Sequence, residues 1–408
     1  MNENKSKARI LLGAAFLMAI SAVGPGFLVQ TARFTEDHGA NHGFIILISL
    51  ILALGVQLNV WRVIGASGMR GQDIANKLVP GLGYFVAFLI VLGGFAFNIG
   101  NVGGAALGLS AMAGIPLEFG YWIAGLLAVV IFISKNTRSI VDWVMKILGV
   151  LMIGIVFVVM FITQPPVGEA AARTVLPQFQ DGLMAAFFPI MTYLGGTVGG
   201  YITFSGAHRL LDAGIKGKEN IKLITASSVQ GVSIAALMRV ILFLAILGVI
   251  AAGYNLNPVE GFPANPAAIA FYHGAGIIGY RFFGVVLLIA GLTSVIGAAY
   301  TSISFLKTLF KPVGNHERLC TIILILISTA VMSFLGSPAN LLVLVGFLNS
   351  LILPVTLSVI LLASRRRDIV GEDYKHPTWM IIMGIIIVGL TLFISIRAFP
   401  SMIANLFG

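Results

Sequence analysis

The sequence predicts an all-α integral membrane protein with eleven membrane-spanning helices, arranged as two consecutive repeats of five and one further helix. Three observations predict this fold class. Of the 408 residues, 58% are hydrophobic and 10% are charged, whereas a soluble globular protein carries about 25% charged residues. The apolar residues form runs long enough to cross a bilayer. Two of these runs, at matching places in the two repeats, are interrupted by helix-breaking residues.

The spans follow from apolar runs of about 20 residues each. The first five make up repeat one, about 10–163, the next five make up repeat two, about 183–363, and the last span is additional. We treat 1–408 as a single transmembrane domain. The spans lie near residues 10–34, 43–65, 82–113, 117–134, 140–163, 183–211, 221–252, 277–308, 319–335, 339–363 and 378–398.

The basic residues predict the topology. With the N-terminus in the cytoplasm, 20 of the 25 lysines and arginines fall on the inner side, 4 fall near the outer face, and Arg239 falls within a span. This is a strong positive-inside bias, and it places the C-terminus outside. It explains the net charge of +10 by contact with the lipid bilayer, without a nucleic-acid partner. We expect a multi-pass protein of the cell membrane, and no obligate protein partner is evident.

The first span contains a break at Gly24, Pro25 and Gly26. Glycine destabilises a helix, and proline lacks an N–H and clashes with the preceding turn. A break inside a bilayer is tolerated where it is buried in protein or lines a cavity. It also presents the free N–H groups and positive dipole of a half-helix N-terminus. The alternative is a kinked helix with a purely structural role.

The sixth span contains a second break, since four of the six residues from 195 to 200 are glycine. Such a run should unwind a helix in the middle of the membrane. Breaks in the first span of each repeat are typical of transporters that bind their cargo near the bilayer midplane. Close helix packing through small residues is the alternative explanation.

Three stretches carry a family resemblance. They are residues 98–106 (NIGNVGGAA), 114–117 (GIPL) and 348–356 (LNSLILPVT). They resemble the NRAMP (SLC11) family of proton-coupled divalent metal transporters, and the order and spacing of elements agree over most of the chain. The resemblance implies the LeuT-like fold of five plus five inverted helices, in which helices 1 and 6 are discontinuous, with one extra helix.

The metal-binding motifs of that family are missing. Its first-span Asp-Pro-Gly-Asn matches Gly24-Pro25-Gly26-Phe27 here, and its sixth-span Met-Pro-His matches Gly199-Gly200-Tyr201. Its acidic third-span positions match Asn98 and Asn101, and all fifteen acidic residues fall in tails, loops or span ends. Divalent metals need carboxylate, imidazole or thioether ligands. We therefore expect no divalent metal site at the centre.

Two stretches resemble the sodium-coupled amino-acid transporters of the same fold. One is Ala22-Val23-Gly24-Pro25-Gly26, followed by Arg33-Phe34, and the other is the run from Ala290 to Ser294 (AGLTS). The resemblance implies a Na⁺ site formed by backbone carbonyls of the first span and hydroxyls of the eighth. Its candidate residues are Ala22, Val23, Ala290, Thr293 and Ser294. In the alternative interpretation, Thr293 and Ser294 hydrogen-bond carbonyls of their own helix.

Arg239 lies near the middle of the seventh span. A charge at that depth costs at least about 2.5–3.5 kcal/mol, so it should face a cavity or a partner. Contact with an anion and a structural role at helix-end carbonyls both remain open.

Together these observations predict a secondary active transporter, a symporter working by alternating access, for a small organic solute with a carboxylate. Backbone N–H groups at Gly24–Phe27 and Gly199–Tyr201 would bind the carboxylate, and Phe27, Asn101 and Tyr201 would shape the pocket. Some NRAMP-like relatives without metal motifs are associated with 5-oxoproline use, so an amino acid or 5-oxoproline-like compound is the expected cargo.

The expected coupling ion is Na⁺ rather than H⁺, and no other cofactor is expected. The alternative function is proton-coupled divalent metal transport through a rearranged site. An intramembrane enzyme is disfavoured, because Ser205 and His208 have no acid or oxyanion motif beside them, and no catalytic residue is assigned.

Overall fold

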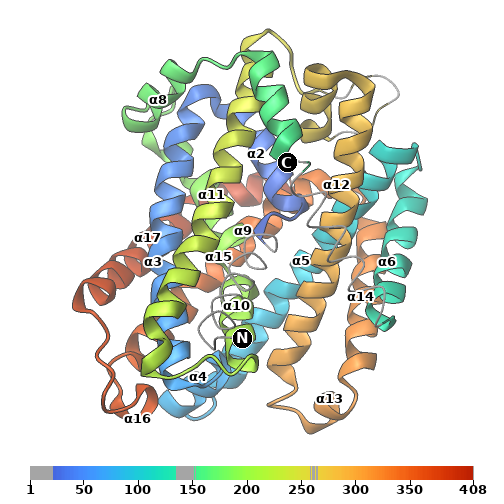
Figure 1. The fold of residues 1–408 in the computed structure, drawn as a ribbon. Helices are drawn as coiled ribbons and strands as arrows, with labels where there is room; N and C mark the ends of the chain where they lie inside the picture. The colour runs from blue at the N-terminus through green and yellow to red at the C-terminus, as the bar shows by residue number, and fades with distance from the viewer. Residues whose placement is uncertain are drawn as a thin grey trace, which may run out of the picture.

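The computed structural model describes residues 22–134, 151, 153–257, 259, 262 and 265–407. Within these ranges every regular element is a helix, and the longer helices run roughly along one common direction (Figure 1). Eight described segments are long and apolar enough to cross a membrane, and a bent ninth is formed by Ile153–Thr163 and Val167–Val175.

The helices alternate long spans with short connecting elements. In chain order the α-helices are α2 (Pro25–His38), α3 (His42–Ser67), α4 (Gly71–Leu78), α5 (Leu82–Ala113), α6 (Leu117–Ile133), α8 (Val167–Val175), α9 (Phe187–Thr197), α10 (Tyr201–Asp212), α11 (Ile221–Ala251), α12 (Pro266–Leu306), α13 (Lys311–Asn315), α14 (Glu317–Leu335), α15 (Pro338–Ala363), α16 (Arg367–Val370) and α17 (Thr378–Phe407). Short 3₁₀ turns lie at Gly39–Asn41, Leu183–Ala186 and Lys218–Asn220.

Most predicted spans agree with the helices, and three differences stand out. Helix α12 begins at Pro266 rather than at 277, because a helical segment before the predicted span runs into it through a kink where Gly276 has φ +64°. Helix α17 continues beyond 398 to Phe407. Helix α8 lies between the spans predicted at 140–163 and 183–211. Parts of the spans predicted at 10–34 and 140–163 lie outside the described residues.

The short helices gather at the two ends of the bundle. Figure 1 shows α8 at one end and α4, α13 and α16 at the other. The second end carries basic residues of the predicted inner loops, namely Arg70, Lys77, Lys311, Arg365, Arg366 and Arg367. Their grouping at one end is the arrangement that a positive-inside topology requires.

Helices α5 and α12 approach each other closely through glycine. A Cβ atom added to Gly108 would lie 2.3 Å from the backbone nitrogen of Leu288, and one added to Gly284 would lie 2.5 Å from that of Met112. Small residues at a crossing let two helix backbones touch, which is how helices associate in lipid. This contact fixes α12, which carries Ser294, against α5, which carries Asn101.

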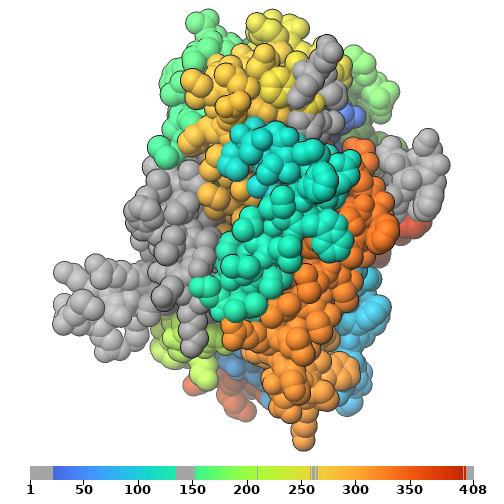
Figure 2. Space-filling view, turned by 90° about the vertical axis from the view of Figure 1, so that its right-hand side faces the viewer, coloured from blue at the N-terminus to red at the C-terminus, as the bar shows by residue number. Residues whose placement is uncertain are grey.

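One face of the molecule is strongly apolar. Figure 2 shows α6 beside α14 on this face. Their outward side chains are exposed and apolar, which fits contact with lipid tails. They include Phe119, Trp122, Leu126, Val130 and Ile133 on α6, and Leu319, Ile323, Ile327 and Phe334 on α14.

A hydrogen-bond network fastens the start of α17 to α3. His376 Nε2 lies 3.0 Å from Asn59 Oδ1, and His376 Nδ1 lies 2.7 Å from the Tyr374 hydroxyl. The geometry fits a neutral imidazole that donates to Asn59 and accepts from Tyr374. Burial, with a smaller contribution from the charge of Arg62, lowers the pKa of His376 to about 4.

We expect this histidine to make stability depend on pH. Its folded pKa of about 4 lies below the unfolded value of about 6.5, so the unfolded chain binds the proton more readily. Stability is complete above the unfolded pKa and falls as the pH drops toward the folded one, by about 1–2 kcal/mol at pH 5. Melting temperatures at pH 7.5 and pH 5 should therefore differ more for wild type than for His376→Gln. Equal pH dependence of the two proteins would contradict a neutral buried imidazole.

Candidate functional site

The first break lies where the sequence predicts it. Ala22 is helical, Val23 and Gly24 form a bend, and α2 starts at Pro25 with Gly24 as its N-cap. Proline at the first helical position is well tolerated, because an N–H there would have no intrahelical acceptor. For the same reason the N–H groups of Gly26 and Phe27 are left without acceptors inside the helix. Helix α2 therefore presents an N-terminus in the interior of the bundle.

The second break separates α9 from α10. Helix α9 ends at Thr197, Val198 and Gly199 leave the helix, and Gly200 takes φ +50° before α10 starts at Tyr201. Only glycine adopts that conformation without strain. Like α2, α10 presents its N-terminus at the break.

The two breaks meet at one cavity. The cavity is small, with a volume of about 10 Å³, which is room for about one water molecule, so an organic occupant requires the lining side chains to move. Helices α2, α5, α9, α10 and α12 all contribute to it. The lining residues are Ala22, Gly24, Gly26, Phe27, Gln30, Phe97, Asn101, Gly196, Tyr201, Ile202 and Ser294.

Two amide side chains give this cavity its polar character. Gln30 is fully buried, and its Nε2 donates to the carbonyl oxygen of Leu342 at 2.9 Å, while its Oε1 has no partner among the described residues. The Nδ2 of Asn101 is likewise buried and has no described partner. Since buried polar groups are normally hydrogen-bonded, the cavity offers one free acceptor and one free donor to an occupant.

Sequence reasoning missed Gln30. The available signal was its position one helical turn after Gly26, which places its amide beside the break. A Cβ atom added to Gly26 would lie 3.5 Å from Gln30 Nε2. Phe97, whose ring packs edge-on against Tyr201 with centroids 5.7 Å apart, was missed as well.

The predicted binding residues divide into two groups. Gly24, Gly26, Phe27, Asn101 and Tyr201 border the cavity, whereas Pro25, Gly199 and Gly200 are not among its lining residues.

The N–H of Gly199 was expected to bind cargo, but it donates to the carbonyl oxygen of Leu194 at 2.8 Å. This bond caps the C-terminus of α9, so the group is already used. Gly200 faces the side chain of Asn349, since an added Cβ atom would lie 2.0 Å from Asn349 Oδ1.

The residues expected to hold Na⁺ lie next to the same cavity. Ala22 and Ser294 line it, and a Cβ atom added to Gly24 would lie 3.0 Å from Ser294 Oγ. Thr293 Oγ1 donates to the carbonyl oxygens of Ile289 and Ala290 at 3.0 and 3.1 Å, as the alternative interpretation expected. A hydroxyl that donates its proton keeps lone pairs for a cation. Val23 lies in the bend that follows Ala22.

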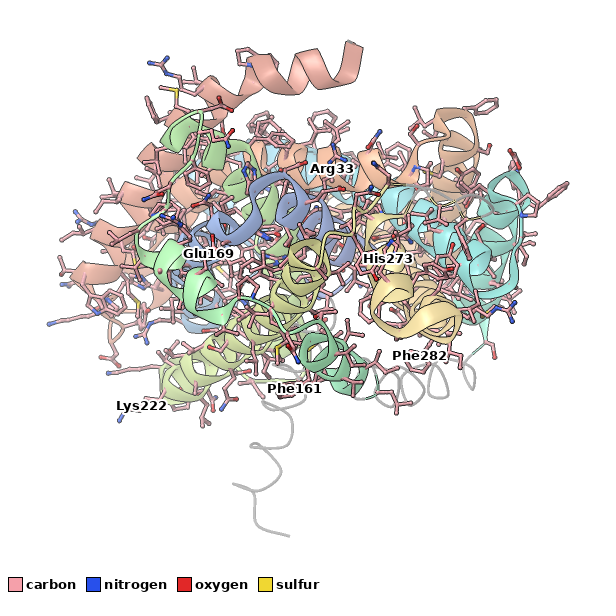
Figure 3. The ribbon with its side chains drawn as sticks, turned by 90° about the horizontal axis from the view of Figure 1, so that it is seen from above. Arg33, Phe161, Glu169, Lys222, His273 and Phe282 are labelled. Carbon is pink, nitrogen blue, oxygen red and sulfur yellow. The ribbon has the colours of Figure 1, made fainter. Side chains whose placement is uncertain are left out.

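The described acidic side chains lie outside the cavity. None of its lining residues is acidic. Glu36 and Asp37 pair instead with Arg33 on the outer turns of α2, at 3.8 and 3.4 Å. Figure 3 shows Arg33 in the view from the end that carries α8. Over the described residues, no group of three or more His, Cys, Asp or Glu side chains could hold a metal ion.

Three further polar residues have structural partners. Ser205 Oγ donates to the carbonyl oxygen of Ile202 at 2.9 Å. His208 Nε2 accepts the backbone N–H of Gly71 at 3.1 Å, which ties α10 to α4. Arg239 stacks between two aromatic rings behind the cavity wall, with its Cζ 4.2 Å from the ring centroid of Phe27 and 3.8 Å from that of Tyr193.

A family model and a bacterial relative each match most of this chain. The family model described as natural resistance-associated macrophage protein-like matches residues 15–400. An uncharacterized membrane protein of Bacillus subtilis is 51% identical over 379 residues, which cover 93% of this chain and 91% of that protein.

Two solved structures share the fold of this chain. The manganese transporter of Eremococcus coleocola, in complex with an aromatic bis-isothiourea substituted compound, superposes with a TM-score of 0.74 at 20% identity, covering 100% of this chain and 90% of that one. MhsT in complex with L-phenylalanine superposes with a TM-score of 0.65 at 17% identity, covering 97% and 98%. These likenesses show the LeuT fold.

Proposed function

The chain belongs to the natural resistance-associated macrophage protein-like (Nramp) family of membrane transporters, and from this premise we propose that it is a symporter for a small carboxylate-bearing organic solute. The observation that carries the proposal is the cavity between the two helix breaks. It receives the N-terminus of α2 and a free amide donor from Asn101, and none of its lining residues is acidic. A helix N-terminus stabilises an anion through its N–H groups and dipole.

The polar groups of the cavity narrow the cargo further. Asn101 Nδ2 and the N–H groups at Gly26 and Phe27 suit a carboxylate, and the free Oε1 of Gln30 suits an N–H donor. A cyclic amino-acid derivative such as 5-oxoproline carries both groups on a small ring. Phe27, Phe97 and Tyr201 would pack against the apolar part of such a molecule.

Uptake by proteoliposomes tests this function. Purified protein would be reconstituted with an imposed Na⁺ gradient, and amino acids, 5-oxoproline and Mn²⁺ would be offered in turn. We expect saturable uptake of a carboxylate solute. Uptake that rises without saturation would indicate a channel, and saturable uptake of Mn²⁺ alone would favour the second candidate function.

That second candidate is divalent metal transport, which the likeness to a manganese transporter suggests. None of the described residues that line the cavity carries the carboxylate, imidazole or thioether ligands that such ions require. We therefore expect titration calorimetry of the purified protein with Mn²⁺ or Cd²⁺ to show no binding at the centre. A micromolar site that is lost on replacing Gly24 or Phe27 would contradict the carboxylate proposal.

Sodium coupling has its own test in α12. Changing Thr293→Val together with Ser294→Ala removes two hydroxyl ligands with little change in size. If Na⁺ binds beside Ala22 and Ser294, uptake by this variant should stop or lose its dependence on Na⁺.

Ser304→Ala is the matched control, because the Ser304 hydroxyl also donates to its own helix, at the carbonyl oxygen of Thr301. It should behave as wild type. Wild-type uptake that ignores Na⁺ and follows a proton gradient would show that the resemblance at Ala290–Ser294 is accidental.

A further inference from the structure

Arg239 is a buried cation with an unusual environment. It lies on α11 with 6% of its surface exposed. The ring of Phe27, from α2, stacks on its guanidinium with a Cζ-to-centroid distance of 4.2 Å, and the ring of Tyr193, from α9, stacks at 3.8 Å. Stacking of this kind is favourable for a cation. It engages the faces of the planar guanidinium, while its N–H donors point outward in the plane.

The donors in that plane are largely unused. Nη1 lies 3.5 Å from the hydroxyl of Thr197. Nε and Nη2 are buried, and no described residue accepts a hydrogen bond from either atom. The N–H groups of Nε and Nη2 lie side by side on one edge of the guanidinium. Together they form a fork whose two parallel donors match the two oxygens of a carboxylate.

No described carboxylate accepts a hydrogen bond from that fork. The nearest titratable neighbours belong to a separate chain of hydrogen bonds, in which the Tyr193 hydroxyl lies 2.6 Å from His42 Nε2, and His42 Nδ1 lies 2.8 Å from Thr35 Oγ1. The acidic side chains found in described ion pairs contact Arg33, Arg70, Lys307 or Arg366 instead.

A purely structural role explains only part of this arrangement. Thr197 is the last residue of α9, so the charge of Arg239 lies where the negative end of that helix dipole falls. A lysine ammonium would serve that purpose as well. The dipole and the two stacked rings account for a planar cation at this place, but they leave the two donors without described partners unexplained.

We propose that the Nε–Nη2 edge of Arg239 is a second carboxylate-binding subsite, separated from the central cavity by the ring of Phe27. Phe27 lines that cavity and also stacks on the guanidinium, so rotation of its side chain would open the guanidinium to the cavity. The occupant is either a second carboxylate group of the cargo or a separate small carboxylate. The subsite rests on the proposed function only in taking the same chemical class of ligand.

Binding measurements test this subsite without relying on transport. Purified protein in nanodiscs would be titrated with sodium propionate, with sodium succinate and, at equal ionic strength, with sodium chloride, using melting temperature and calorimetry as readouts. Propionate should stabilise the wild type, and chloride should not, because the fork selects a planar pair of oxygens. Arg239→Lys keeps the charge but loses the fork, so in a Gly24→Val background, where the central cavity is filled, it should weaken propionate binding at least about tenfold.

A second variant separates the subsite from the central cavity. Gly24→Val places a side chain in that cavity and leaves Arg239 intact, so it should still bind propionate. If succinate binds wild type more tightly than propionate does, and if Gly24→Val removes this difference, the occupant is one cargo molecule with two carboxylates. Equal affinities of the two acids would identify a separate small carboxylate.

Several outcomes would overturn the subsite. They are propionate binding by Gly24→Val that Arg239→Lys leaves unchanged, equal stabilisation by chloride and propionate, or no carboxylate binding by wild type. If Arg239→Lys does not fold, infrared spectra of wild type with ¹³C-carboxylate propionate decide the question. A shift of the carboxylate bands on binding indicates bidentate pairing, and unshifted bands contradict it. Failure of uptake with intact propionate binding would refute the proposed function alone.

Discussion

Replacing Gly24 by valine is expected to abolish uptake while the protein still inserts and folds. Gly24 has φ −85° and ψ −176°, a conformation that any residue adopts. A Cβ atom there would lie 3.0 Å from Ser294 Oγ and 3.9 Å from Asn101 Oδ1. The branched side chain would therefore occupy the cavity at its polar end and block the N-terminus of α2. Radiolabelled uptake by reconstituted vesicles, with expression and monodispersity checked by size exclusion, is the measurement.

Gly297→Val is the matched control for this variant. Gly297 lies on α12, one helical turn from Thr293, and a Cβ atom added there meets no heavy atom within 4 Å. It should transport as wild type does. Normal uptake by Gly24→Val would mean that the cargo does not pass through the space between the two breaks.

Replacing Gly200 by alanine is expected to cause the largest loss of stability. Gly200 has φ +50°, and an added Cβ atom would lie 2.0 Å from Asn349 Oδ1. Asn349 cannot easily move away, because its Nδ2 donates to the carbonyl oxygens of Gly93 and Val345, both at 3.1 Å. Backbone strain and overpacking together should cost about 2–4 kcal/mol.

The melting temperature of purified Gly200→Ala should accordingly be well below that of wild type, and its yield should be lower. Gly389→Ala on α17 is the control, because no heavy atom lies within 4 Å of an added Cβ atom there. If both variants melt like the wild type, the link between α9 and α10 does not need a left-handed residue, and the second break has a different geometry.

The two helix breaks could be predicted from the sequence because their signals are local. Glycine and proline disturb a helix through their own backbone properties, whatever surrounds them. Gly24-Pro25-Gly26 therefore marked the start of α2 correctly, and the glycines from 195 to 200 marked the gap between α9 and α10. The absence of acidic residues from the sequence motifs likewise agrees with the lining of the cavity.

The different structural roles of these glycines could not be predicted from such local signals. Gly199 and Gly200 look equivalent in sequence. The N–H of Gly199 caps the C-terminus of α9, whereas Gly200 faces the side chain of Asn349. Which backbone groups remain free depends on how the chain caps its helix ends and on contacts with α15. Such contacts join residues that are far apart in the sequence.

The same limit applies to the side chains around the cavity. The Nε2 of Gln30 donates a hydrogen bond to the carbonyl oxygen of Leu342 on α15, and its Oε1 has no described partner. No local sequence pattern indicates this contact. The burial cost of Arg239 was foreseeable, but its stacking between Phe27 and Tyr193 depends on the packing of three helices. Sequence therefore located the two helix breaks, and the structure adds the donors and acceptors beside them.

A cryo-electron microscopy structure of the wild type with its transported solute bound tests the central claim most directly. The account predicts a carboxylate at the N-terminus of α2, with its oxygens within about 3 Å of the backbone nitrogens of Gly26 or Phe27 or of Asn101 Nδ2. The Oε1 of Gln30 should face an N–H group of the same molecule. A metal ion in this cavity, or a solute bound away from both breaks, would contradict the account.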